Sequence, residues 1–362
     1  MAGCVWEEEP RLSEEELSKD GPDSPGGPKI SIVGIGGAGN RLLTNIIGNE
    51  VATAERCVAV NTDRVQLSRS LAHNKVLLGE DIVDGRGAMG SVLLGKRALQ
   101  LSAHRITSFV DASDMTIILV GFGGGTGTAA APMIAQWARS QVKPVVAVVA
   151  LPFTHERERR FVALRGLKRM SEACDCTIVV DNATSSPDSD ESPGRSADAT
   201  AVVTVRRISE ALSRLEPAVM KNMMRVMTLG SLAVACVRNV QPEGNLTSAV
   251  IESIRSPSSE LPLSQARGAV LMHTGPVSLR QGQANHIYET VSSLVGHEIS
   301  FAYGSVVSPD SQLCLLLTGY QYDSSIGGFV ELLTDLYDVE YGQREDRLDS
   351  PLWLPLYQLE GS

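Results

Sequence analysis

Aromatic residues and basic charge are both scarce in this chain. Phe, Trp and Tyr make up 4% of its 362 residues, so stacking on nucleic-acid bases is not a general use of its surface. Lysine and arginine together number 32 against 42 aspartates and glutamates, which gives a formal net charge of −10. A protein built to hold nucleic acid shows a basic stripe instead. We therefore expect no nucleic-acid partner.

Long apolar runs and paired cysteines are missing as well. No apolar stretch approaches the roughly 18–20 residues needed to cross a bilayer, and the first segment is acidic rather than basic. Two of the six cysteines lie close together, but Cys174 and Cys176 have the wrong spacing for a CxxC redox or zinc site. We expect a cytoplasmic protein without a membrane span, whose cysteines are reduced and serve as small hydrophobic residues.

From Lys29 onward, short apolar runs alternate with segments of helical spacing. The runs KISIVGI, CVAVN, KVLL, DMTIILVG, KPVVAVVALPF and CTIVVDN are expected to be strands. Continuous apolar strands separated by helices indicate a parallel sheet that is covered on both faces. After Gly244 the pattern changes to two helices and the strands GAVLMHTG, EISFAYGSVV and QLCLLLTGY, whose adjacent strands are compatible with antiparallel pairing. The fold class is α/β, with a parallel-sheet domain and a second, smaller α/β domain.

Two glycine-rich segments follow expected strands. The first, GIGGAGN at residues 34–40, fits the pattern GxGxxG. Taken alone this pattern also fits a dinucleotide site of the Rossmann type, which would need an acid about 20 residues further on. Asp63 lies later than that, so the fit is only fair. A Rossmann-type NAD(P)-dependent oxidoreductase therefore remains an alternative.

The second segment, GFGGGTGT at residues 121–128, opens an expected helix. Glycines let backbone N–H groups crowd around an anion, and a helix N-terminus adds about half a positive charge. The segment therefore predicts a polyphosphate cradle, although tight packing of strand against helix would also require glycines. No GxxxxGK[ST] occurs in the chain, which excludes a P-loop. Without a lysine, backbone dipoles, hydroxyls and Mg²⁺ would have to balance the phosphate charge.

Six segments, in sequence order, resemble the tubulin/FtsZ superfamily, and FtsZ more than tubulin. They are VGIGGAGN, AVNTD, KVLLGEDIVDGRGAMGS, GFGGGTGTAAAP, LPFTHERERR and VVDN, and the resemblance extends from about Lys29 to Tyr320. It implies a GTP-binding domain of tubulin/FtsZ type, a central helix and a smaller C-terminal α/β domain. It also implies GTP or GDP as ligand, Mg²⁺ with GTP, and head-to-tail assembly into filaments at a division site.

The resemblance assigns roles to individual residues. Those that would hold the nucleotide, chiefly its phosphates, are Gly36, Gly37, Asn40, Gly87, Ala88, Gly123, Gly124, Gly125, Thr126, Gly127 and Thr128. Glu156 and Arg160 would reach the ribose and the loop around it. Asn182 would face the guanine, and Asp198 would accept from the guanine N1–H and amino group. An acceptor at this position rejects adenine, which offers it no donor.

The same resemblance divides the chain into five regions. We expect a disordered acidic tail at 1–28, a GTP-binding domain at 29–197, a central helix with an altered catalytic loop at 198–232, a C-terminal domain at 233–322 and a tail at 323–362. Residues 348–359 of that tail, which include Trp353, Leu354 and Leu356, resemble the FtsZ C-terminal peptide that docks onto membrane anchors. Packing of these side chains onto the second domain is the alternative.

In the family, a loop of one subunit completes the GTP site of the next subunit in the filament. The corresponding loop of this chain lacks the acidic residues that the resemblance leads us to expect. Family members supply two aspartates there, in a pattern like NxDxxD. Here no Asp or Glu occurs between Pro217 and Arg238, and an ungapped match places Lys221 and Met224 where the acids belong. Losing a group that activates water typically costs about 10²–10⁴ in rate. We therefore assign no catalytic residue and no protein metal ligand, and whether this chain is a GTPase stays open.

Three functions are compatible with the sequence. The first is a GTP-binding filament protein with weak or absent hydrolysis, alone or in mixed filaments with a conventional FtsZ. The second is the dinucleotide-dependent oxidoreductase. The third is a GTP-sensing regulator that binds filaments without forming them. Nucleotide binding separates the second from the others, and electron microscopy with GTP separates the first from the third.

Overall fold

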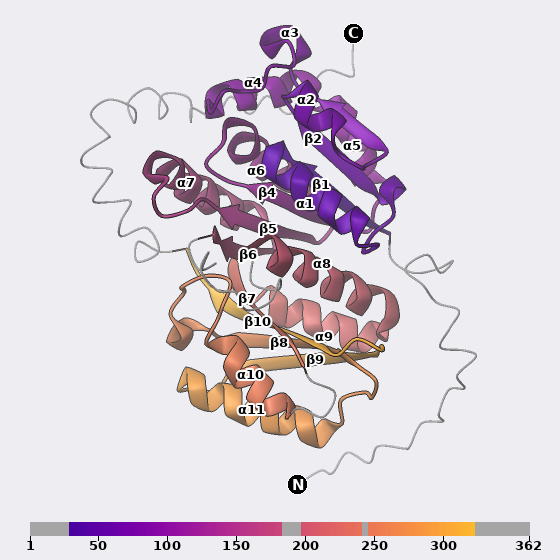
Figure 1. Cartoon of the computed structure of the whole chain (residues 1–362), viewed down its shortest axis with the longest axis vertical. Helices are drawn as coiled ribbons and strands as arrows, with labels where there is room; N and C mark the ends of the chain where they lie inside the picture. The colour runs from indigo at the N-terminus through magenta and orange to yellow at the C-terminus, as the bar shows by residue number, and fades with distance from the viewer. Residues whose placement is uncertain (1–28, 183–196, 241–244, 323–362) are drawn as a thin grey trace.

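A computed structural model describes residues 29–182, 197–240 and 245–322 (Figure 1). The strands are β1 Ile30–Ile35, β2 Cys57–Asn61, β3 Asn74–Leu77, β4 Met115–Gly121, β5 Val145–Leu151, β6 Cys176–Asp181, β7 Leu232–Asn239, β8 Gly268–Gly275, β9 Ser300–Val307 and β10 Gln312–Tyr320. The helices are α1 Gly36–Gly48, α2 Arg64–Ser68, α3 Glu80–Val83, α4 Val92–Ser102, α5 His104–Asp111, α6 Gly125–Ser140, α7 Arg157–Ala173, α8 Ala197–Arg214, α9 Pro217–Met227, α10 Leu246–Ile254 and α11 Gln281–Val295.

One sheet runs through the whole described chain. Its ten strands lie in the order β3-β2-β1-β4-β5-β6-β7-β10-β8-β9. The strands from β3 to β7 are parallel, as the apolar runs predict. β10 is antiparallel to both β7 and β8, whereas β8 and β9 are parallel. The expected antiparallel pairing is therefore present, but β8 separates β9 from β10, so these two consecutive strands are not neighbours.

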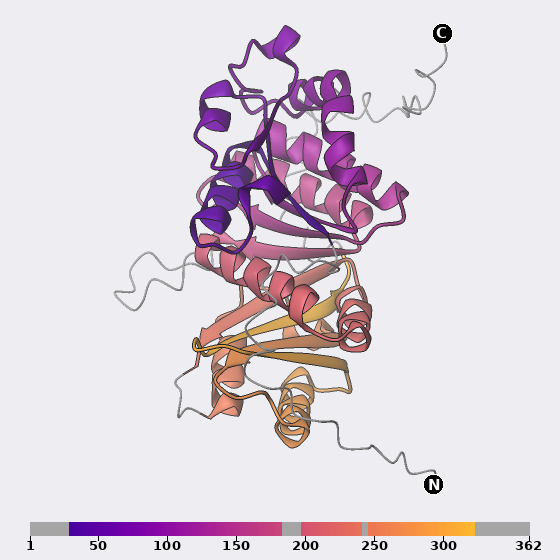
Figure 2. The same cartoon turned by 90° about the vertical axis from the view of Figure 1, so that its right-hand side faces the viewer.

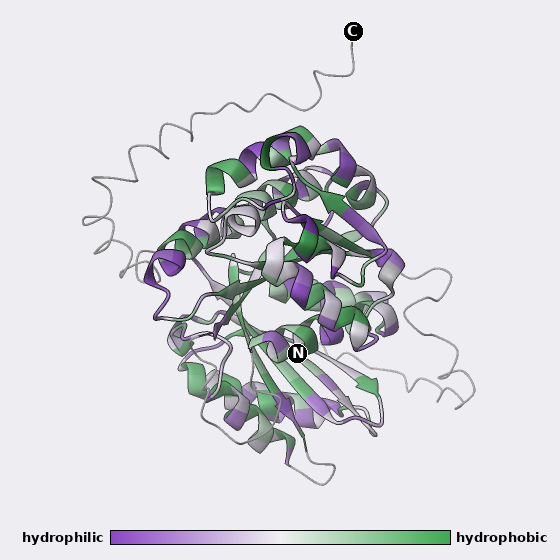
Figure 3. Cartoon of the chain, turned by 45° about the horizontal axis from the view of Figure 1, so that its top comes forward, coloured by the Kyte–Doolittle hydropathy of each residue, from purple (hydrophilic) through white to green (hydrophobic). Residues whose placement is uncertain are grey.

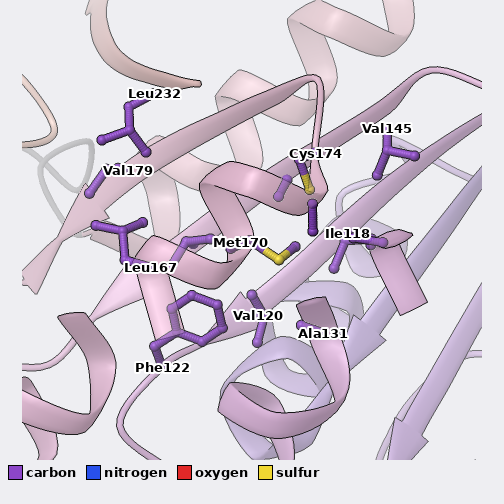
Figure 4. Close-up of a cluster of buried hydrophobic side chains, with 14 of the residues drawn as sticks. Ile118, Val120, Phe122, Ala131, Val145, Leu167, Met170, Cys174, Val179 and Leu232 are labelled. Atoms are coloured by element: carbon purple, nitrogen blue, oxygen red, sulfur yellow. The ribbon is translucent and has the colours of Figure 1, made fainter. Parts of the chain in front are cut away.

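The core has a layer on each face of this sheet. Every residue of β1, β2, β5 and β6 is buried, which explains why these strands are apolar without alternation. Figure 4 shows part of one layer, in which Phe122, Leu167 and Met170 pack beside strand residues such as Val120. In Figure 3 the strands are largely hydrophobic, while the helices combine both colours. The sheet thus holds the turns between strands and helices in fixed positions.

The helix α8 crosses the middle of the molecule between the earlier and later parts of the chain (Figures 1 and 2). Its buried face includes Ala201, Val205 and Ile208. Helix α9 follows it and buries Met223, Val226 and Met227. Gly304 of β9 lies so close to this corner that a Cβ there would be 2.3 Å from the Cδ1 atom of Leu215. The expected central helix is thus present as α8, at the start of the region 198–232, but the proposed domain boundaries stay predictions.

Some expected features lie outside the described residues. These are both tails, including the segment 348–359, and most of the Ser/Pro/Asp-rich loop after Asn182. The segment from Val92 to Asp111 is two helices, α4 and α5, that meet at Ala103. Among the described residues, no helix is both long enough and apolar enough to span a bilayer.

The cysteines of the described chain are all buried and free: Cys57, Cys174, Cys176, Cys236 and Cys314. Burial raises the pKa of Cys57, Cys176 and Cys314 to about 12 and raises the pKa of the other two as well. This agrees with their expected use as small hydrophobic residues. Because only the thiolate is nucleophilic, these thiols should not react while the protein is folded.

We expect a Cys4→Ala chain to give no reaction with an aromatic disulfide reagent at about pH 8 under native conditions. Cys4 is replaced because it lies outside the described residues. After unfolding in denaturant, the five remaining thiols should all react. Stoichiometric modification of any thiol without loss of the native circular dichroism signal would contradict their burial.

Candidate functional site

The turn between β1 and α1 consists mainly of glycines, so few side chains surround its backbone. Gly36, the first residue of α1, has φ +71°, a value that favours glycine. A Cβ at Gly36 would lie 3.1 Å from the backbone nitrogen of Gly127 in α6. No side chain caps the N-terminus of α1. The first glycine segment therefore touches the second and leaves backbone N–H groups of its helix without a side-chain partner.

The turn between β4 and α6 has the same character. Gly123 has φ +92°, and its N–H donates to the hydroxyl of Thr128 at 3.0 Å. Gly124 is the N-cap of the 16-residue helix α6, and no side chain caps that end. A Cβ at Gly124 would meet no protein atom within 4 Å, whereas one at Gly127 would lie 2.7 Å from the carbonyl of Gly121. Gly127 is thus required for packing, and Gly124 borders open space.

Two uncapped helix N-termini therefore converge at one edge of the sheet. Each brings N–H groups with no intrahelical acceptor and the positive end of a helix dipole. This is the combination that binds phosphate in proteins. The arrangement fits the predicted polyphosphate cradle. The hydroxyl of Thr128 accepts from the N–H of Gly123 and the hydroxyl of Thr126 pairs with that of Thr62, so the direct contact of either hydroxyl with a phosphate stays a prediction.

The loop that contains Gly87 and Ala88 closes another side of this cradle. The N–H of Gly87 donates to the carbonyl of Thr62 at 3.1 Å. Ala88 lies against α6, because a Cβ at Gly125 would be 2.9 Å from the Cβ of Ala88. Asp84 and Met89 of the same loop have positive φ values of 49°. The structure thus brings both predicted residues to the start of α6.

The end of β2 supplies residues to which the sequence analysis gave no role. The hydroxyls of Thr62 and Thr126 are 2.7 Å apart and buried. The amide of Asn61 donates to Oδ1 of Asn40 at 2.9 Å, and Asn40 in turn donates to the carbonyl of Gly34 at 3.1 Å. Asn40 is only 3% exposed, so its side chain orders the turn around the first glycine segment. The signal for these residues is the polar ending NTD after an apolar strand.

Glu156 and Arg160 are bound mainly to other protein groups. Arg160 makes a two-pronged ion pair with the buried Asp181 at 2.9 and 2.5 Å, and it also donates to the carbonyl of Pro152 at 2.7 Å. The hydrogen bonds to Asp181 raise the pKa of Arg160 above its usual value. The carboxylate of Glu156 accepts from the N–H of Phe153 at 3.1 Å and pairs with Arg159. Contact of Glu156 and Arg160 with a ribose stays a prediction.

The residues predicted to face the base lie at the ends of two elements. Asn182 directly follows β6, and Asp198 lies in the first turn of α8. Asp198 is already engaged, because Arg41 of α1 donates to both of its carboxylate oxygens, at 2.8 and 3.1 Å. No role was expected for Arg41, although it directly follows Asn40. A role for Asn182 and Asp198 in recognising guanine also stays a prediction.

The altered loop forms the start of α9. Lys221, Asn222 and Arg225 are exposed on this helix, and Arg225 donates to the side chain of Asn222 at 3.1 Å. The nearest preceding acid, Glu216, is exposed at the N-cap position and caps no N–H. Two positive charges and no negative one therefore lie within the helix. This surface can attract an anion, but within α9 it offers no carboxylate that would activate water.

Comparisons with known proteins agree with this architecture. The description "Tubulin/FtsZ family, GTPase domain" matches residues 29–185. The chain is 31% identical over 304 residues to cell division protein FtsZ 1 of Methanocaldococcus jannaschii, which covers 81% of this chain and 83% of that protein. Among solved structures, an empty FtsZ dimer from M. jannaschii matches with a TM-score of 0.71 and 29% identity, covering 85% of this chain and 93% of that one. The GTPγS-bound protofilament of CetZ2 from Haloferax volcanii shares the fold at a TM-score of 0.70, with 23% identity, and covers 86% of this chain and 98% of that one.

Proposed function

Because the chain belongs to the tubulin/FtsZ family, we propose that it binds GTP and forms, or modulates, head-to-tail filaments of the cell-division or cytoskeletal type. The converging N-termini of α1 and α6 support the nucleotide site, since they present backbone donors around space that a Cβ at Gly124 would enter. The solved structure of an FtsZ dimer from M. jannaschii supports self-association. The comparisons give no support to a dinucleotide-dependent oxidoreductase.

Magnesium would be bound through the nucleotide. Among the described residues, no three His, Cys, Asp or Glu side chains come together to hold a metal ion. Mg²⁺ commonly keeps several waters and is held by substrate phosphates with few protein ligands, so this donor set fits a nucleotide-borne ion. When bound, the ion would offset phosphate charge in a site that has no lysine.

The composition of α9 carries the second part of the proposal, which is weak or absent GTP hydrolysis by the chain alone. In the proposed filament α9 faces the nucleotide of the next protomer. Lys221 and Arg225 are exposed there and no acid lies within the helix, so α9 has no carboxylate that can accept a proton from a water. The intact nucleotide face, by contrast, would accept the acidic loop of a conventional FtsZ. A mixed filament would then hydrolyse the GTP that this chain holds.

Phosphate release by the purified protein tests both parts. We expect GTP binding with little release by the chain alone, and release when a conventional, acid-bearing FtsZ is added. A variant of that FtsZ without its loop acids is the matched control, because it should assemble without restoring release. Rapid release by the chain alone would contradict the assignment of α9. Co-sedimentation of the two proteins that does not depend on GTP would count against the mixed filament.

The place of the protein in the cell follows from the same proposal. We expect a cytoplasmic filament that is recruited by a membrane-anchor protein through residues 348–359. That segment lies outside the described residues, so the proposal depends on its sequence, LDSPLWLPLYQL, in which Trp353 and several leucines form the kind of apolar cluster that docks into a partner groove. Unchanged localisation after deletion of residues 348–362 would exclude this docking.

A further inference from the structure

The ion pair between Arg41 and Asp198 involves the carboxylate that is predicted to recognise the guanine. Nε of Arg41 donates to Oδ2 of Asp198 at 2.8 Å, and Nη2 donates to Oδ1 at 3.1 Å. One flat guanidinium thus occupies both carboxylate oxygens. The contact is accessible to solvent, since the side chains are 58% and 26% exposed. The described residues leave the pair partly exposed, so a ligand can reach it.

A second contact fixes where along the helices this pair lies. Arg206 of α8 donates to the carbonyl of Asn49 at 2.8 Å. Both contacts join residues that are 157 positions apart, so α1 and α8 run in the same direction and in constant register. Eight helical residues separate the two contacts, which is about 12 Å. The Arg41–Asp198 pair joins the middle of α1 to the first turn of α8, on the side nearer the phosphate cradle, and the Arg206 contact is at the far end of α1.

The guanidinium of Arg41 presents the same pattern of donors as guanine. Guanine offers N1–H and its exocyclic amino group as two parallel donors, and a carboxylate accepts both in the way it accepts an arginine fork. Two such partners approach the same outward lone pairs of Asp198 and therefore exclude each other. Adenine has an acceptor at N1 and cannot make this contact. Arg41 and guanine thus compete for one group, whereas adenine does not.

We propose that Arg41 is a specificity-determining residue that competes with guanine for the carboxylate of Asp198, so that recognition of the base requires the ion pair to open. The inference rests on the proposed GTP site. It means that this chain distinguishes guanine from adenine less sharply than the same site would without Arg41. Because the pair is exposed and screened by water, its opening lowers GTP affinity only about two- to fivefold.

The test compares dissociation constants for GTP and ATP, measured by calorimetry on the full chain and its variants. Removing a positive charge weakens the attraction of any triphosphate, so the ratio of the ATP to the GTP dissociation constant is the readout. We expect Arg41→Ala to raise this ratio about two- to fivefold. Arg206→Ala is the matched control, because it removes an arginine contact between the same two helices at the far end, and it should leave the ratio unchanged.

Two further measurements separate competition from other roles. In an Asp198→Ala chain, the additional Arg41→Ala change should no longer raise the ratio. Raising the salt concentration from about 0.05 to about 0.5 M should weaken the pair and bring the wild type closer to Arg41→Ala. An unchanged or lowered ratio in Arg41→Ala overturns the inference while leaving the GTP site intact. If neither the wild type nor Arg41→Ala binds a purine nucleotide, the proposed function fails and the inference with it.

Discussion

Replacing Lys221 and Met224 by aspartate is expected to raise phosphate release from GTP by a factor on the order of 10²–10⁴. These are the positions of α9 where an ungapped match to the family places its two acids. Carboxylates there would face the terminal phosphate of the next protomer in the proposed filament and accept a proton from the attacking water. The measurement is the steady-state rate of phosphate release per sedimented protein, so that altered assembly does not imitate altered chemistry.

The matched control for this prediction is the variant with asparagine at both positions. Asparagine has the shape of aspartate but cannot accept the proton, so Lys221→Asn with Met224→Asn should remain slow. Lys221 is exposed and Met224 is half-buried, so a melting curve on each variant verifies that α9 still packs through Met223, Val226 and Met227. Equal acceleration by asparagine would show that removing the cation, and not adding a base, is what matters.

The sequence predicted the parts of the site that depend on local backbone. Glycine segments after apolar strands could be placed at one edge of a parallel sheet, because the carboxyl ends of such strands lie together. Gly36, Gly127 and Ala88 do meet there. The central helix was expected from the resemblance, and the regular apolar spacing of α8 agrees with it.

The sequence could not predict contacts between side chains far apart in the chain. Arg41 and Asp198 are 157 residues apart, and Arg160 and Asp181 meet only because α7 returns along β6. No periodic pattern records such a pairing, since any arginine can reach several carboxylates until the backbone is placed. The separation of β9 from β10 was missed for a related reason. The insertion of β8 between them is a property of the sheet order and leaves no trace in either strand.

Replacing Gly124 by valine is expected to weaken GTP binding by about a hundredfold or more while leaving the stability of the protein unchanged. A Cβ at this position meets no protein atom within 4 Å, so we expect the fold to have room for a small side chain. The same space borders the uncapped N-terminus of α6, where the phosphates are proposed to bind. Losing one or two hydrogen bonds to a charged group costs about 3 kcal/mol, which corresponds to that factor. Calorimetric titration with GTP and a thermal melt measure the two effects.

Substitutions at two other glycines serve as controls, because they show whether the loss of GTP binding in Gly124→Val is specific to the nucleotide site. A Cβ at Gly48, at the far end of α1, also meets no atom within 4 Å, so Gly48→Val should change neither binding nor stability by a comparable amount. A Cβ at Gly39 would lie 2.3 Å from the carbonyl oxygen of Leu119, so Gly39→Ala should lower the free energy of unfolding by about 1–3 kcal/mol. Gly39 is thus a glycine that packing requires, and Gly124 is one that packing does not explain. If a Gly124→Val chain binds GTP as well as the wild type does, the phosphates do not bind at the N-terminus of α6.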